Sequence, residues 1–122
     1  LRPFAGTASL LLYRERLMAW IYLLIASAAE IVWAYSLKAS DGFTRPLMVG
    51  LNIAALLVAV WFLVQAMRVL PLGTAYAVWT GIGVVGAAIL GVVVMGESAS
   101  PMRLSAIAII VAGVVVLKFA ES

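Results

Sequence analysis

The stretch ASAAEIVWAYSLK, residues 26–38, decides the fold because it combines a continuous apolar helix pattern with an acid at its centre. It belongs to an apolar run from about residue 20 to 37, long enough to cross a hydrocarbon core of roughly 30 Å. A carboxylate in the middle of that core costs about 2.5–3.5 kcal/mol on insertion scales. Intramembrane acids usually face a polar interior and mark ion or proton pathways, so Glu30 is the first candidate functional residue.

The composition of the chain places this helix in an integral membrane protein. Of its 122 residues, 66% are hydrophobic and only 11% are charged, whereas soluble domains have about 45–50% apolar and about 25% charged residues. Cysteine and histidine are both absent from the sequence. We therefore expect no disulfide, no zinc or copper site, no cofactor and no Ser-His or Cys-His nucleophile. The net charge of +3 comes from scattered loop cations, which do not predict a nucleic-acid partner.

Hydropathy predicts an all-α membrane fold with four transmembrane helices. The predicted spans cover residues of about 20 to 37, 47 to 67, 74 to 95 and 104 to 120. Turn signals separate them, including Pro71 with Gly73, and Ser100 before Pro101 as a helix cap and first helical residue. The loops are short, so residues 18–122 are expected to form a single four-helix transmembrane domain.

Residues 1–17, LRPFAGTASLLLYRERL, differ from the rest of the chain. Their apolar segment is too short to span a bilayer and ends abruptly at the charged triplet 14–16. We interpret them as an over-extended reading frame or a disordered leader. The alternative is a signal or interfacial segment, although a secretory signal would need a longer apolar region and a small-residue cleavage site.

The loop cations predict no single orientation in the membrane. Counted from residue 18, they are Arg68 and Lys118 on the N-terminal face, and Lys38, Arg45 and Arg103 on the opposite face. This difference is too small for the positive-inside rule to select an orientation, so insertion in both directions is expected. The leader's Arg2, Arg14 and Arg16 would tip the balance toward the N-terminal face.

Small residues in the third and fourth spans predict close helix packing and an oligomer. Four short helices are too few to enclose a path for a solute. The third span contains GIGVVGAAILG, residues 81–91, and small residues let helix backbones approach each other in lipid. The alternative is that glycine is simply common in membrane helices. The fourth span carries no charge before Lys118, so we expect it to serve packing or dimerisation.

Three segments together resemble the small multidrug resistance family, within its guanidinium exporter branch. They are AEIVWAYSLKASDGFTR (29–45), LPLGTAYAVWTGIGVVGAAILG (70–91) and GESASPMRL (96–104). The resemblance covers residues 18 to 118. It implies an antiparallel, dual-topology homodimer in the bacterial inner membrane. It also implies exchange of guanidinium ions for protons by alternating access, and therefore a transporter and not an enzyme.

The chemistry around Glu30 agrees with that implication. Ser27 and Trp33 share its helical face, and Tyr76 and Trp79 project together from the third span. A planar guanidinium can donate paired N–H groups to a carboxylate and stack on aromatic rings. Cation and proton would then compete for one carboxylate. We expect a hydrogen bond from the Trp33 indole to Glu30. The alternative for Tyr76 and Trp79 is an interfacial aromatic belt, but the resemblance makes all three aromatics binding-site residues.

Two positions depart from the pattern of the branch. Ala59 stands where a serine usually helps to bind the central glutamate, and Ser27 stands where glycine is usual. Ser27 is a candidate to replace the missing hydroxyl. These departures keep two alternatives open: an exporter of quaternary ammonium or lipophilic cationic drugs, and one subunit of a heterodimeric pair. A membrane enzyme is not expected, because Glu30 has no second catalytic group in its own span.

Overall fold

Four long α-helices make up the chain in the computed structural model, which describes residues 2–121 and the side chains of residues 6–120. The helices are α1 (Arg2–Ala39), α2 (Pro46–Met67), α3 (Leu72–Val93) and α4 (Pro101–Glu121). Each is long and apolar enough to cross a membrane. The prediction of a four-helix membrane fold is therefore confirmed. Leu1, Ser122 and the side chain of the leader cation Arg2 lie outside the described residues.

The first loop reverses the chain through three consecutive residues with positive φ. Asp41, Gly42 and Phe43 have φ values of 50°, 70° and 65°, which fits the turn expected from the Asp-Gly pair. Pro46 then opens α2, where its fixed φ suits the first helical position. The second helix consequently agrees with the predicted span within one residue.

The third helix begins and ends about two residues earlier than predicted, at Leu72 and Val93. Pro71 at the N-cap, with an extended ψ of 148°, starts it. At the other end Gly96 has a φ of 70°, and the backbone N–H of Glu97 donates to the Gly91 carbonyl at 2.9 Å. These groups close the helix as glycine-dependent C-caps do.

The predicted cap of the fourth helix is confirmed. The Ser100 hydroxyl accepts a hydrogen bond from the backbone N–H of Arg103 at 3.3 Å, and Pro101 is the first helical residue. The helix thus begins three residues before the predicted span, because the cap and the proline start it before the apolar run.

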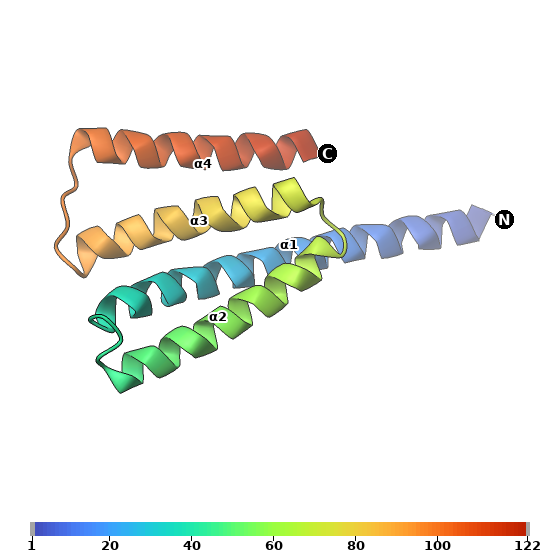
Figure 1. Cartoon of the computed structure of the whole chain (residues 1–122). Helices are drawn as coiled ribbons and strands as arrows, with labels where there is room; N and C mark the ends of the chain where they lie inside the picture. Colours follow the sequence, from blue (N-terminus) through green and yellow to red (C-terminus); the bar gives the residue numbers. More distant parts are fainter. Residues whose placement is uncertain (1, 122) are drawn as a thin grey trace.

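The first helix differs most from the prediction, because residues 2–17 continue it as α-helix where disorder was expected. After Pro3 and Gly6 this segment contains mostly good helix formers, and no proline interrupts it. In Figure 1 the N-terminal part of α1 extends beyond the ends of the other helices. The side chains of its apolar segment, including Leu10 and Tyr13, are exposed.

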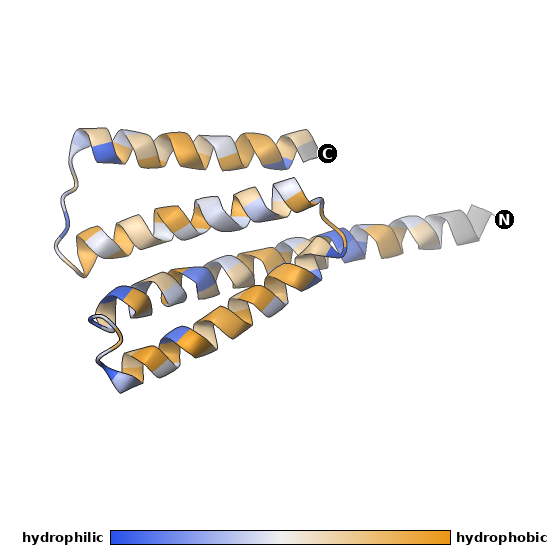
Figure 2. Cartoon of the chain, viewed as in Figure 1, coloured by the Kyte–Doolittle hydropathy of each residue, from blue (hydrophilic) through white to orange (hydrophobic). Residues whose placement is uncertain are grey.

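The helices lie roughly along a common direction with alternating polarity (Figure 1). The N-terminus, the α2–α3 loop and the C-terminus lie at one end, and the other two loops lie at the opposite end. The first helix packs against both α2 and α3, whereas the backbone of α4 lies close to that of α3 alone. Apolar residues cover the outer faces as well as the inner ones (Figure 2), as expected for helices surrounded by lipid.

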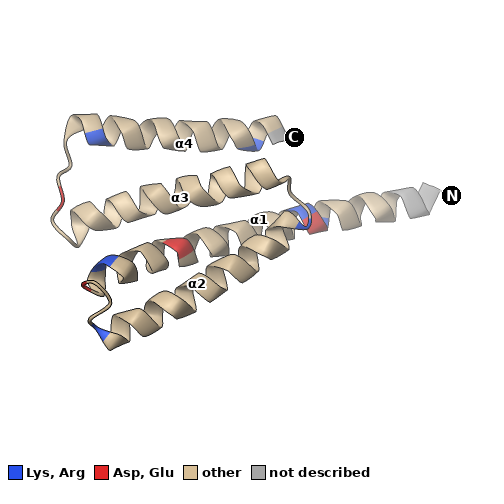
Figure 3. Cartoon of the chain, in the orientation of Figure 1, with Lys and Arg blue, Asp and Glu red and all other residues tan. Residues whose placement is uncertain are grey.

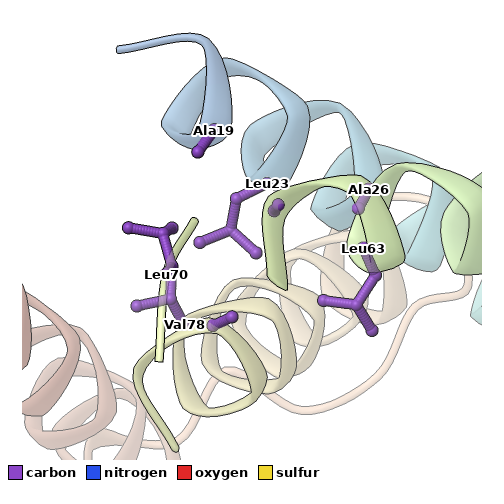
Figure 4. Close-up of a cluster of buried hydrophobic side chains, with 8 residues drawn as sticks. Ala19, Leu23, Ala26, Leu63, Leu70 and Val78 are labelled. Carbon is purple, nitrogen blue, oxygen red and sulfur yellow. The ribbon is translucent and has the colours of Figure 1, made fainter. Parts of the chain in front are cut away.

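The core of the chain is a compact cluster where α1, α2 and α3 meet (Figure 4). It includes Ala19, Leu23 and Ala26 of α1, Leu63 of α2 and Val78 of α3. The buried row of α2 repeats every three or four residues and is mostly alanine. Small side chains there let α1 and α2 approach closely, which holds the Glu30 segment of α1 against its neighbours.

Candidate functional site

Glu30 lies midway along the membrane-spanning part of α1, away from the other charged residues. Figure 3 shows the charged positions gathered near the two ends of the bundle, the triplet 14–16 of α1 among them, with one acidic position of α1 standing between these ends. The Glu30 side chain is half-buried and lies on Gly83 of α3. A Cβ atom built on Gly83 would stand 2.6 Å from Glu30 Cγ, closer than real side chains approach. The glycine therefore provides the space that the acid occupies.

The aromatic pair predicted on the third span is present and is tied to the Glu30 segment. Tyr76 and Trp79 of α3 have ring centroids 5.5 Å apart. The Trp79 indole Nε1 donates to the Ala26 carbonyl of α1 at 3.2 Å. Ala26 is one turn before Glu30, just as Trp79 is one turn before Gly83. The two helices therefore run in parallel with matched turns, and along α3 Trp79 lies one turn and Tyr76 two turns before the glycine on which Glu30 rests.

Trp33 is half-buried one turn beyond Glu30, but its expected indole bond to Glu30 is absent. Among residues 2–121, its hydrogen bonds to other side chains involve its backbone carbonyl, which accepts from Ser36 Oγ at 3.0 Å and from Asn52 Nδ2 at 2.9 Å. The prediction of an indole-to-carboxylate bond is thus wrong for this structure. The neighbouring helix α2 therefore contacts Trp33 through its backbone carbonyl and not through its ring nitrogen.

Ser27 is fully buried, and its hydroxyl donates to the Leu23 carbonyl at 2.8 Å. Serine side chains inside helices commonly donate to the carbonyl of the preceding turn in this way. Its proton is therefore directed to its own helix and not to Glu30. Ala59, the other departure from the branch pattern, is fully buried on α2 and supplies no hydroxyl to the site.

A buried polar group that sequence analysis missed lies beside Trp33. Asn52 of α2 is 6% exposed, and its amide also reaches Ser36 Oγ at 3.3 Å. The available signal was an amide two turns into an apolar span, in the segment GLNIA. Polar residues in such spans tend to bind other helices or line functional sites.

A cavity of about 410 Å³ lies between α1, α3 and the α3–α4 loop. Its lining extends from Arg103 in α4 to Ala34, which is one turn beyond Glu30. Arg103 Nη2 pairs with Glu97 Oε1 at 2.7 Å at the loop end of this cavity. The cavity thus connects the end of the helix bundle with the neighbourhood of the central acid.

Two basic side chains near one end of the bundle contact other side chains. The ammonium group of Lys118 lies 5.4 Å from the ring centroid of Trp20. Arg68 Nη1 donates to Gln65 Oε1 at 3.3 Å. Both contacts lie near the same end of the bundle, where long basic side chains extend toward the interface.

Comparison with known proteins places most of the chain in one family. The model of the small multidrug resistance protein family matches residues 18–121. The guanidinium exporters of Citrobacter freundii and Salmonella typhimurium are each 57% identical to this chain over 101 residues. The guanidinium exporter of Escherichia coli K12 is 54% identical over 101 residues. In each case the aligned region covers 83% of this chain and 96% of the relative.

Proposed function

The chain belongs to the small multidrug resistance family, and from that premise we propose that it is a proton-coupled antiporter for guanidinium and small substituted guanidines. The similarity to exporters named for guanidinium supports the substrate class. The observation that carries the mechanism is Glu30, a carboxyl group held on Gly83 inside the membrane-spanning bundle. Export then proceeds by alternating access to this group.

Competition at Glu30 provides the coupling. The carboxylate can hold a proton or a guanidinium ion, but a protonated carboxyl group cannot form the charge-assisted pair that the cation requires. On each side of the membrane, Glu30 therefore exchanges a bound proton for a guanidinium ion or the reverse. In this exchange the carboxyl O–H bond breaks, the proton passes to water, and the guanidinium ion takes its place on the carboxylate.

The aromatic residues around Glu30 favour a flat cation. Guanidinium is planar and weakly hydrated, so it can donate N–H groups to the carboxylate while a face lies against an aromatic ring. We assign Trp33, Tyr76 and Trp79 to the walls of this site. Ser27 is assigned a positioning role through the α1 backbone, since its hydroxyl is bonded to Leu23.

The functional unit we propose is an antiparallel homodimer of dual-topology protomers in the bacterial inner membrane. The support is that the backbone of α4 lies close to that of α3 alone, which leaves most of an apolar helix surface uncovered within the chain. Two copies would bring two Glu30 carboxyl groups to one central site. A heterodimer with a related chain is the alternative assembly.

Ala59 favours a second candidate substrate class. This buried position carries no hydroxyl, whereas the guanidinium exporter branch that the chain resembles usually has a serine there that helps to bind the central glutamate. An exporter of quaternary ammonium or lipophilic cationic compounds is therefore the runner-up, and transport of tetramethylammonium separates the two.

Proton release tests the proposal directly. Adding guanidinium to purified protein in weak buffer should release protons that a pH indicator detects. Glu30→Gln should release none, and Glu30→Asp should retain a reduced release because its carboxylate is retracted by one methylene. Glu15→Gln, an exposed acid on the same helix, is the matched control and should behave as wild type. Proton release from Glu30→Gln equal to wild type would refute the central role of this acid.

A further inference from the structure

Asn52 forms a closed set of polar contacts between α2 and α1. Its Nδ2 atom donates to the Trp33 carbonyl at 2.9 Å and to Ser36 Oγ at 3.3 Å. Ser36 Oγ in turn donates to the same carbonyl at 3.0 Å. Asn52 is 6% exposed and Ser36 is fully buried. A carbonyl inside a helix thus accepts from two side chains, one of them on another helix.

These contacts stand at one end of the helical turn that carries Glu30. At the other end Trp79 of α3 donates to the Ala26 carbonyl, which by helix geometry also accepts the backbone N–H of Glu30. The Glu30 turn is therefore tied to α3 one turn before the acid and to α2 one turn after it. Both ties are side-chain donors on α1 carbonyl oxygens, so together they fix how this turn is rotated and placed.

Helix packing alone does not require an amide at position 52. The other buried positions of the same α2 row are Ala55, Ala59, Leu63 and Ala66, and apolar residues there pack α2 on α1. A carboxamide buried in a membrane span is unfavourable unless its groups are hydrogen-bonded. Its donor atom is aimed at the backbone of Trp33, three residues after Glu30 on the same helix. Since the backbone sets the direction of the Cα–Cβ bond, this contact sets where the Trp33 indole stands.

We propose that Asn52 is a positioning residue that sets the shape selectivity of the transporter by holding Trp33 beside Glu30. The inference rests on the proposed function, because it takes the indole of Trp33 as a wall of the cation site. With Asn52 in place the ring stands where a flat guanidinium can lie against it. Without the amide the ring is free to move, and the advantage of a planar cation over a tetrahedral one falls.

The test compares variants by transport and by the environment of Trp33. Asn52→Leu keeps the volume and removes the donor, Asn52→Gln keeps an amide, and Ser36→Ala removes the second partner. Ser40→Ala is the matched control, because Ser40 is a buried serine directly after α1 whose hydroxyl donates to the Leu37 carbonyl, accepts from the Phe43 N–H and does not contact Asn52. Each protein is reconstituted for guanidinium and tetramethylammonium transport. Each is also labelled with fluorotryptophan, with the Trp33 resonance assigned from Trp33→Phe.

We expect Asn52→Leu to lower the ratio of guanidinium to tetramethylammonium transport about five- to tenfold, the effect of one hydrogen bond. Ser36→Ala should lower it less, Asn52→Gln should restore part of it, and Ser40→Ala should leave it unchanged. The Trp33 resonance should move in Asn52→Leu and not in Ser40→Ala. An equal loss for both cations, or an unmoved Trp33 resonance, would overturn the positioning role.

Two parts of the experiment distinguish a failure of the proposed function from a failure of the positioning role of Asn52. If wild-type protein fails to transport guanidinium, the proposed function fails, and the Trp33 resonance still decides whether Asn52 positions the ring. If Asn52→Leu does not fold, Asn52→Gln and Ser36→Ala decide by the same two readouts. In that case an unchanged ratio and an unmoved resonance in both variants overturn the inference.

Discussion

Glu30 fits into the bundle because position 83 is a glycine. We predict that Gly83→Ala, whose new Cβ would stand 2.6 Å from Glu30 Cγ, displaces the carboxyl group and lowers guanidinium transport at least tenfold. A misplacement of about 1 Å at a reacting group can cost about 100-fold in rate. Gly73→Ala is the control on the same helix, because nothing lies within 4 Å of its added Cβ. Similar transport rates for the two variants would show that the contact with Gly83 does not position Glu30.

Selectivity for the shape of the substrate should depend most strongly on Trp33. We predict that Trp33→Gly narrows the preference for guanidinium over tetramethylammonium, because it removes a flat wall and opens space for a tetrahedral cation. Electrophysiology on reconstituted protein measures both cations in one preparation. Trp61→Gly is a suitable control, since Trp61 is exposed on α2. Retention of the wild-type preference in Trp33→Gly would remove Trp33 from the site.

Sequence patterns indicated candidate residues and which of them share a helix face, but not their hydrogen-bond partners. Glu30 follows from one acid in an apolar span, and the Tyr76–Trp79 pair follows from its helical spacing. Helical spacing relates residues on one face of one helix, but it does not say which carbonyl of a neighbouring helix a side chain will reach. For that reason the bond from Trp79 to Ala26 and the role of Asn52 emerged only from the structure.

At the scale of helices, α3 is the element that joins the others. Its glycines contact α1 on one side and α4 on the other: Gly86 packs on Ile31, and Gly81 packs on Val114. Each contact is too close to admit a Cβ without displacement of the neighbour. The small-residue segment that the sequence marked for packing is therefore used twice within one protomer, which a pattern on one helix could not reveal.

The contact between Gly81 and Val114 gives a test of the α3–α4 interface. We predict that Gly81→Ala lowers the thermal unfolding temperature in detergent, because overpacking costs about 1–3 kcal/mol. Gly73→Ala again serves as the control, with open space around its added Cβ. An unchanged unfolding temperature for Gly81→Ala would mean that α4 is not held on α3 through this glycine.

Helix starts coincide with a proline or a cap that is visible in the sequence. Pro46, Pro71 and the Ser100–Pro101 pair fixed three starts. The start of α1 could not be predicted in this way. Its leader reads as too short and too charged to span a bilayer, yet the local residues favour helix and no breaker separates them from the first span. The position where an apolar run begins depends on side-chain polarity, whereas the position where a helix begins depends on backbone preferences and caps, so the two need not coincide.

At the scale of the whole molecule, the cations at the two ends of the bundle are nearly balanced in number once residues 1–17 are left out of the count. From residue 18 onward we predict that the chain inserts in both orientations, because two cations face three across the membrane. Accessibility of a C-terminal tag from each side of the membrane measures this. Residues 1–17 add cations to one end, so their presence should enrich one orientation relative to a version that begins at Met18. A single orientation in that shorter version would contradict the prediction.

Coupled exchange of guanidinium for protons at Glu30 is the central claim, and uptake into acid-loaded liposomes tests it most directly. Radiolabelled guanidinium is added outside vesicles whose interior is acidic, with no guanidinium gradient beyond the added trace. The account predicts that wild-type protein accumulates guanidinium while protons leave, that accumulation stops when the pH gradient is collapsed, and that Glu30→Gln accumulates none. Accumulation by Glu30→Gln at the wild-type rate, or wild-type uptake that ignores the pH gradient, would contradict the account.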